Sequence, residues 1–419
     1  MRSAVAAVTM SIAVTAAAVT AVCPEPPGGS RSMPVALTTL VVEGSSTNPG
    51  GDGIADFYGG RFADPDTTTV NFLTGPYGIW SALRSSDSGP DTVLSSGWGA
   101  ANASLLLGYL GATGDPMLTG STWVLDNNVA GPNGGFGTRY PVFAAIGVNP
   151  LPTALPDTAA GDVVVISTAT EYDLNSNAPK YLLNPVADLN SLATYLDGRL
   201  GQGSLVLPVN DDGTPGCAGA AGCTATTTPG GPTEVSFTTA DGQPAGARVE
   251  QVDGVTYVGY RTERLPLLAP LRRYGGATGT LLADAAEPAL RATVDYGYPN
   301  NDPLADPGSH RPAGLLPTPT ETRTYLRELR AGLATGGQLL RSGVADRTGA
   351  DRPAADTAGA QTRPGADGRR SVRGTADSVR PPAVRAAVQR LSRSLGIGQR
   401  DAAKPDARPH TDGQHTDGQ

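Results

Sequence analysis

The side chains that most often act as catalytic bases are rare in this sequence. It contains three histidines, His310, His410 and His415, among 419 residues. His310 lies in a Pro-rich stretch, and the other two lie in a repeated pentapeptide at the carboxyl end, so we interpret all three as solvated. Hydroxyl groups are plentiful, but a hydroxyl is a poor nucleophile unless a base lies within hydrogen-bond distance. The sequence shows no evident nucleophile–base pair, and no metal site or cofactor motif is expected.

Two cysteines are spaced for a small covalent loop. Cys217 and Cys223 are separated by the flexible run Ala-Gly-Ala-Ala-Gly. In an oxidising compartment this spacing favours a disulfide. Metal binding would need further ligands, and no histidine is near in the sequence. Two surface thiols without a role are the remaining alternative.

The elements that would position such side chains alternate between strands and helices. Apolar runs ended by polar or Gly-rich loops predict strands at Leu37–Val42, Thr92–Ser96, Thr122–Leu125, Asp162–Ser167, Val235–Phe237 and Val255–Tyr260. Helices are predicted at Ala100–Leu110, Leu183–Leu196 and Thr320–Arg341, with Leu189, Leu192 and Leu196 at helical spacing. Residues 210–232 are rich in Gly, Thr and Pro and predict a loop. The alternation indicates an α/β fold with a mainly parallel sheet and flanking helices.

Composition limits the partners. The formal net charge is −8, so a generally basic nucleic-acid-binding surface is not expected. Residues 343–419 hold 13 Arg plus Lys against 9 Asp plus Glu, a net of +4, which leaves −12 for residues 1–342. This segment has almost no aliphatic bulk and predicts a disordered tail. Its apolar island Pro382–Leu395 predicts a transient helix or, alternatively, contact with an anionic membrane or a partner.

The amino terminus predicts export. Residues 1–21 contain one basic residue before an uninterrupted stretch of apolar and small residues, and end in a small-residue cleavage site. A disordered leader is the alternative. Cys23 raises the question of a lipoprotein, but Val22 is larger than the residue that normally precedes a lipidated cysteine. We therefore expect an exported protein, extracellular or in the cell envelope.

Several stretches resemble the PE-PPE domain family of mycobacteria and related actinobacteria. The likeness rests on Asn128–Gly135 followed by Arg139–Pro141, on Thr170–Asp173 followed by Leu189–Leu192, and on Thr262–Arg272, supported by Ala283–Asp284, Glu287–Arg291 and Gly297–Tyr298. It is strongest over residues 37–300 and predicts a domain at 37–342. The resemblance implies an α/β-hydrolase-like serine esterase fold linked to cell-envelope lipids. We expect a divergent member in which a leader, rather than a PE or PPE helical module, precedes the domain.

The resemblance also implies a Ser, Asp and His triad that is incomplete here. The nucleophile belongs on a sharp strand-to-helix turn, and Gly97 occupies that position. A shift of register would offer Ser96 instead. Asp173 matches the acid. The base would lie at Asp197–Leu200, which contains no histidine, and His310 is the nearest alternative downstream.

The loops around this turn supply the expected ligand contacts. The Glu43–Pro49 loop would contribute backbone amides to an oxyanion hole, but a carboxylate at Glu43 would oppose a developing negative charge. We expect binding residues at Gly44, Ser45, Trp98, Asn128 and Asn133. The resulting hypothesis is a catalytically degenerate hydrolase fold that binds lipid or acyl-ester ligands. The alternatives are an esterase or acyltransferase with an unconventional nucleophile, and an envelope adaptor that uses its basic tail on membrane surfaces; the oligomeric state is left open.

Overall fold

The computed structural model describes residues 40–64, 66–86, 91–154, 163–298, 302–305, 307 and 309–350. The predicted leader at 1–21, Cys23 and the chain beyond residue 350 lie outside the described residues.

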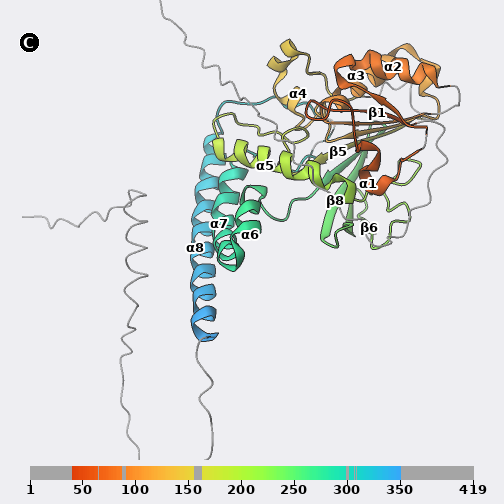
Figure 1. Ribbon diagram of the computed structural model, residues 1–419. Helices are drawn as coiled ribbons and strands as arrows, with labels where there is room; N and C mark the ends of the chain where they lie inside the picture. The colour runs from red at the N-terminus through yellow and green to blue at the C-terminus, as the bar shows by residue number, and fades with distance from the viewer. Residues whose placement is uncertain are drawn as a thin grey trace, which may run out of the picture. The chain divides into compact units, whose positions relative to one another are not determined.

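The described chain is built on one nine-stranded sheet, which confirms the predicted α/β class (Figure 1). Its strand order is β2-β1-β3-β4-β5-β9-β8-β7-β6. The first six strands in that order pair in parallel, and β8, β7 and β6 extend the sheet in antiparallel fashion beyond β9. The bounds are β1 Leu40–Glu43, β2 Thr68–Val70, β3 Thr92–Ser96, β4 Thr122–Asp126, β5 Val164–Thr170, β6 Thr224–Thr227, β7 Thr233–Thr238, β8 Pro244–Val252 and β9 Val255–Tyr260.

Helices cover both faces of the sheet, so its central strands are buried on both sides. Val93 and Leu94 are neighbours on β3, yet they belong to separate core clusters, one beneath α2 and α3 and the other beneath α1 and the antiparallel strands. The helices are α1 Phe57–Gly60, α2 Gly75–Ser85, α3 Trp98–Thr113, α4 Phe136–Arg139, α5 Pro185–Gly201, α6 Ala269–Tyr274, α7 Gly276–Asp295 and α8 Pro319–Ala350. No described helix is long and apolar enough to cross a membrane.

Most predicted elements are present, and the differences have local causes. The predicted loop at 210–232 contains the short strand β6, and β8 was not predicted because its polar residues and Gly246 hide the strand pattern. The leucines expected on the packed face of α5 are exposed, by 57% at Leu189, 41% at Leu192 and 57% at Leu196. The buried face of α5 carries small and polar residues instead, among them Asn190, Ser191 and Thr194.

Helix α8 is longer than predicted. It continues past Arg341 to Ala350, so the first eight residues of the segment expected to form a disordered tail, 343–350, are helical. Its register follows from close packing on α7, because Gly332 lies against Pro288 and Gly336 lies against Ala285. Residues 343–350 contain no proline, so the helix can continue there even though Gly343 and Gly349 have a low helix propensity.

Cys217 and Cys223 form a disulfide with a Cα–Cα separation of 5.8 Å, and both pack on the core cluster beneath the antiparallel strands. Replacing both by serine is expected to lower the free energy of unfolding by about 2 kcal/mol, since the short loop regains its freedom in the unfolded chain. Urea denaturation of the variant measures this. The control is the intact mass with and without reductant. Reduction of the disulfide adds one hydrogen to each sulfur, so a chain whose mass does not change on reduction held no disulfide.

Candidate functional site

Gly97 forms the turn between β3 and α3, at the position where the resemblance places a nucleophile. Its φ is 59° and its ψ is −115°, and its N–H donates to the Asp126 carbonyl at 2.9 Å. A residue with a side chain pays strain in this conformation, typically about 1–3 kcal/mol, whereas glycine adopts it freely. The backbone thus keeps the geometry of a nucleophile elbow, but the residue at its apex has no side chain.

The amide of Asn175 fills the space in front of this turn. A Cβ on residue 97 would lie 2.7 Å from Asn175 Nδ2 and 3.6 Å from the Cβ of Ser45. Asn175 therefore reaches the place from which a serine would attack. Sequence reasoning missed this residue, and its only signal was its position two residues after Asp173.

Asp173 is buried and holds its own turn. Its Oδ1 accepts from the N–H of Asn175 at 2.9 Å, from the N–H of Ser176 at 2.9 Å and from the Ser176 hydroxyl at 3.0 Å. Burial raises the pKa of Asp173 to about 6, against the lowering effect of these hydrogen bonds. The carboxylate is thus close to Gly97 through Asn175, but the hydrogen bonds described here serve the turn rather than a histidine.

No described histidine contacts the Gly97 turn. The ring Nε2 of His310 donates to the Thr138 carbonyl at 2.9 Å, which occupies one of its two nitrogens. Asp197, at the start of the segment where the resemblance would place the base, is exposed and pairs with Arg273 at 3.3 Å. Within the described residues, no group of His, Cys, Asp or Glu is arranged to hold a metal ion.

A second carboxylate, Asp126, lies at the same sheet edge and was not predicted. It accepts from the hydroxyls of Tyr58 at 2.5 Å, Ser96 at 2.9 Å and Thr168 at 3.3 Å. Burial raises the pKa of Asp126, although these hydrogen bonds act in the opposite direction. Ser96 is buried, and its hydroxyl is held by this hydrogen bond to Asp126. The signal in the sequence was an acid directly after the apolar run of β4.

Glu43 is buried beneath the first turns of α3. Its Oε1 accepts from Asn102 Nδ2 at 2.9 Å, while its Oε2 is buried without a hydrogen-bond partner. Burial raises the pKa of Glu43 to about 9, so the side chain is neutral at pH 7. Burial therefore opposes the negative charge that was expected at Glu43 near an oxyanion, because desolvation disfavours the ionised carboxylate.

This burial predicts a pH dependence of stability. The pKa of Glu43 rises from 4.5 to about 9 on folding, so the folded chain binds one more proton than the unfolded chain between these values, and stability falls as pH rises. The raised pKa of Asp173 also makes stability fall as pH rises, but only up to about pH 6. Between pH 6 and pH 9 we expect wild type to lose about 4 kcal/mol and Glu43→Gln to lose little. Urea titrations across this window test the effect, and parallel pH profiles of the two proteins would contradict it.

The remaining predicted binding residues lie in two loops. The N–H of Gly44 donates to the Val70 carbonyl at 3.3 Å, and the N–H of Ser45 donates to Asn48 at 2.8 Å. Asn128 is buried, and its Nδ2 donates to Thr153 at 2.7 Å and to Ser167 at 3.2 Å.

Asn133 Oδ1 is 3.5 Å from Arg139 Nη2. Of these predicted residues, only Ser45 lies against the Gly97 turn in the contacts described. A ligand contact from Gly44, Asn128 or Asn133 stays a prediction.

Trp98 lines an open cleft of about 580 Å³ beside the elbow. The walls come from η2 (Phe72–Thr74), the start of α2, helix α3, the end of η4 (Pro141–Ile146) and the residues that follow η4. Most of the lining residues are apolar: Phe72, Leu73, Leu105, Ile146, Val148 and Leu151. Phe72 and Trp98 pack with their ring centroids 5.7 Å apart. Neither Asp173 nor the 128–135 loop lines this cleft.

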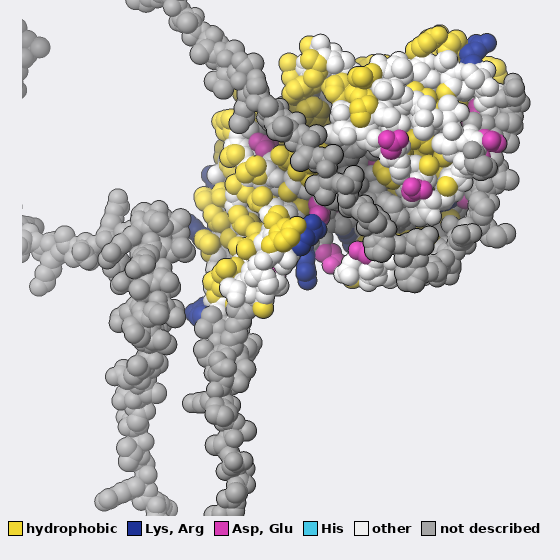
Figure 2. All heavy atoms as spheres, in the orientation of Figure 1, with side chains coloured by type: hydrophobic (Ala, Val, Ile, Leu, Met, Phe, Trp, Pro, Cys, Tyr) yellow, Lys and Arg dark blue, Asp and Glu magenta, His cyan; other side chains and the backbone are white. Residues whose placement is uncertain are grey.

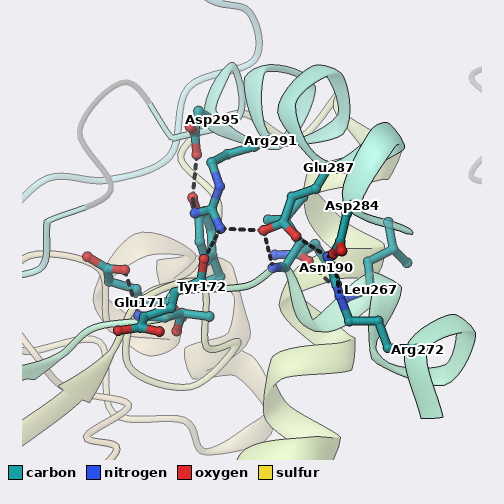
Figure 3. A network of polar contacts seen from close by, with 12 residues as sticks. Glu171, Tyr172, Asn190, Leu267, Arg272, Asp284, Glu287, Arg291 and Asp295 are labelled. Atoms are coloured by element: carbon teal, nitrogen blue, oxygen red, sulfur yellow. Dashed lines mark hydrogen bonds and ion pairs between the residues drawn. The ribbon is translucent and has the colours of Figure 1, made fainter. Parts of the chain in front are cut away.

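A polar network links the turn that carries Asp173 to helices α6 and α7 (Figure 3). Glu287 lies between two arginines and accepts from Arg291 Nη2 at 2.7 Å and from Arg272 Nη2. Arg291 Nη1 donates to the Tyr172 hydroxyl at 3.3 Å, and this hydroxyl donates to Asp295 at 2.6 Å. The motif residues of the segment 262–291 thus hold helices together and support the backbone beside Asp173.

Comparison with known proteins identifies relatives of this chain. A sequence model of the PE-PPE domain family matches residues 234–299. The chain is 28% identical over 229 residues to "Esterase PE16" of Mycobacterium tuberculosis (strain ATCC 25618 / H37Rv), covering 52% of this chain and 34% of the relative. It is 29% identical over 234 residues to "Uncharacterized PPE family protein PPE28" of the same organism, covering 54% of this chain and 30% of the relative. The chain thus spans about a third of the length of these relatives. No solved structure gives a significant match.

Proposed function

Since this chain is a PE-PPE family member, we propose that it binds acyl or lipid ligands in the cleft beside Trp98 without hydrolysing them. The observation that carries the proposal is the elbow itself. Gly97 keeps the backbone conformation of a nucleophile turn, and Asn175 Nδ2 occupies the space in front of it. An amide can donate a hydrogen bond to a ligand carbonyl, but it cannot attack one.

The apolar cleft supports a ligand with a hydrocarbon chain. Leu73, Ile146 and Leu151 line the cleft and are 77%, 65% and 59% exposed. Large apolar side chains that remain exposed around a cleft gain free energy when a ligand covers them, by about 25 cal/mol for each Å² of apolar surface buried. Hydrophobic side chains also gather over the helices α6–α8 and over the α2–α4 end of the molecule (Figure 2).

The first test separates binding from hydrolysis. One curated relative carries the name esterase, so hydrolysis of acyl esters is the competing function. We expect no stoichiometric labelling by a fluorophosphonate and no p-nitrophenyl ester hydrolysis above that of the denatured chain. Stoichiometric labelling would refute the non-catalytic proposal, and mass mapping of the labelled peptide would identify the nucleophile.

The second test measures ligand binding. A fluorescent fatty acid is titrated into wild type, into Ile146→Glu/Leu151→Glu and into Leu182→Glu/Leu183→Glu. The first pair lines the cleft, and the second pair is similarly exposed, at 47% and 67%, but lies outside it. We expect about tenfold weaker binding for the cleft pair, because a ligand chain would desolvate the new carboxylates, and unchanged binding for the control pair. Equal binding by both variants would show that the ligand binds outside this cleft.

We also propose export to the cell envelope. Residues 1–21 carry the pattern of a secretory leader, and the disulfide between Cys217 and Cys223 is typical of oxidising compartments. Expression of the full chain in an actinobacterial host, followed by amino-terminal sequencing of the envelope and culture fractions, tests this. An uncleaved chain confined to the cytoplasm would overturn it.

A further inference from the structure

A second cleft, which shares no residue with the apolar one, is lined mostly by the segment that the family model matches. It has a volume of about 630 Å³. Its walls are the start of β8, the segment 261–266 that follows β9, helix α6 and Asp197 of α5. The proposed acyl binding leaves this cleft without a role.

Arginines dominate the charged groups of this cleft. Arg261, Arg264, Arg272 and Arg273 line it against two acids, Asp197 and Glu263, in a chain whose formal net charge is −8. Arg261 pairs with Glu234 at 2.7 Å, and Arg273 pairs with Asp197 at 3.3 Å. In both pairs the arginine and its acid are between 43% and 60% exposed. Pairs this exposed are weak and can exchange for a stronger anionic partner.

Two of these arginines have unused donors. Arg264 is exposed, and among the described residues no carboxylate lies within ion-pair distance of it. Arg272 is only 11% exposed, and its Nη2 is fixed by Asp284 and Glu287. Its Nη1 is buried and has no hydrogen-bond partner. A buried guanidinium nitrogen without a partner carries a desolvation cost that an oxyanion in the cleft would remove.

We propose that this cleft, which we call the arginine cleft, binds a phosphoryl group. Guanidinium forks match the oxygens of a phosphate, and a doubly charged group can engage several arginines at once, whereas one bidentate pair satisfies a carboxylate. The group belongs either to a soluble phosphate ester or to the headgroup of an anionic phospholipid. The inference does not rest on acyl binding, since the two clefts have no residue in common.

The test compares two variants of the full chain with wild type. Arg264→Ala/Arg273→Ala removes two exposed arginines of the arginine cleft. Arg327→Ala/Arg330→Ala removes two exposed arginines of α8 outside it and changes the net charge equally. Calorimetric titration with inorganic phosphate and with glycerol 3-phosphate measures the soluble ligand. Sedimentation with vesicles of phosphatidylcholine, alone or mixed with phosphatidylglycerol, measures the headgroup.

We expect saturable binding by wild type that weakens with added salt, is about tenfold to a hundredfold weaker in the cleft variant and is unchanged in the α8 variant. Binding of the solutes identifies a soluble ester as the ligand, and binding of the mixed vesicles alone identifies the headgroup. Equal loss in both variants would show a general charge effect and overturn the proposal. So would the absence of any saturable binding by wild type.

Discussion

A Gly97→Ser/Asn175→His double variant is expected to hydrolyse short p-nitrophenyl esters about a hundredfold faster than Gly97→Ser alone, the lower end of what a positioned general base contributes. The serine restores a hydroxyl on a turn that already has the required backbone conformation. Because Asn175 Nδ2 lies 2.7 Å from the Cβ that residue 97 would have, an imidazole on residue 175 is within reach of the new hydroxyl. Asp173 holds the N–H of residue 175 and remains in place as a nearby acid.

The single variants isolate each part. Gly97→Ser alone must displace the Asn175 amide and finds no base, so its rate should stay near background. Asn175→His alone has no nucleophile, and Gly97→Ser/Asn175→Ala provides the space without the base. The rate of the double variant should rise with pH as the imidazole loses its proton near its ordinary pKa of about 6.5. If Gly97→Ser alone were as active as the double variant, a base would already be present, and His310 would be the first candidate.

The contact between Asn175 and Gly97 is a feature of the site that the sequence alone does not predict. The strand β3, the turn at Gly97 and the helix α3 follow from a local pattern of apolar and small residues, and the structure has them at the predicted positions. Asn175 reaches Gly97 across 78 residues of chain, through the packing of β3 beside β4 and β4 beside β5. No spacing rule within either segment reports such a contact. The same limit applies to Asp197, because chain position suggested a base there while the fold turns it toward Arg273.

Burial explains the other differences between the sequence-based predictions and the structure. The sequence shows that Glu43 is acidic, but the raised pKa of this side chain comes from its burial, which outweighs the opposing hydrogen bond from Asn102. The leucines of α5 have the spacing of a core-facing stripe, yet the buried side of this helix carries short polar residues. One of them is Asn190, whose Oδ1 accepts from the Leu267 N–H at 3.1 Å. A hydrophobic pattern predicts the helix, and only tertiary contacts decide which side faces inward.

Replacement of Glu287 by alanine is expected to lower the free energy of unfolding by about 3 kcal/mol. The carboxylate is 14% exposed and accepts from Arg272, from Arg291 and from the N–H of Leu265 at 2.9 Å. Removing it leaves two partly buried guanidinium groups without their shared partner, which is the costly way to break a buried ion pair. Burial by itself would raise the pKa of Glu287, but the hydrogen bonds and the arginine charges hold the pKa below its usual value. Its contribution is therefore present above the unfolded pKa and is lost as pH falls through the folded one.

The matched control is Asp284→Ala. Asp284 also binds Arg272, at 3.0 Å, but its side chain is 46% exposed and Arg272 keeps Glu287 when it is removed. We expect a loss below about 1 kcal/mol for this variant. Chemical denaturation near neutral pH measures both values, and equal losses in the two variants would refute the central role of Glu287.

The consequence of Glu287→Ala should extend to the elbow. Arg291 connects Glu287 to the Tyr172 hydroxyl, and Tyr172 is held at a φ of 65°, a conformation that bulky residues rarely adopt. Tyr172 directly precedes Asp173, whose carboxylate fixes the N–H of Asn175. Loss of Glu287 therefore frees the backbone that places the amide in front of Gly97. Amide hydrogen exchange in residues 171–177 should rise more in Glu287→Ala than in Asp284→Ala, which would assign the Glu287–Arg291 part of the matched segment to support of the site rather than to chemistry.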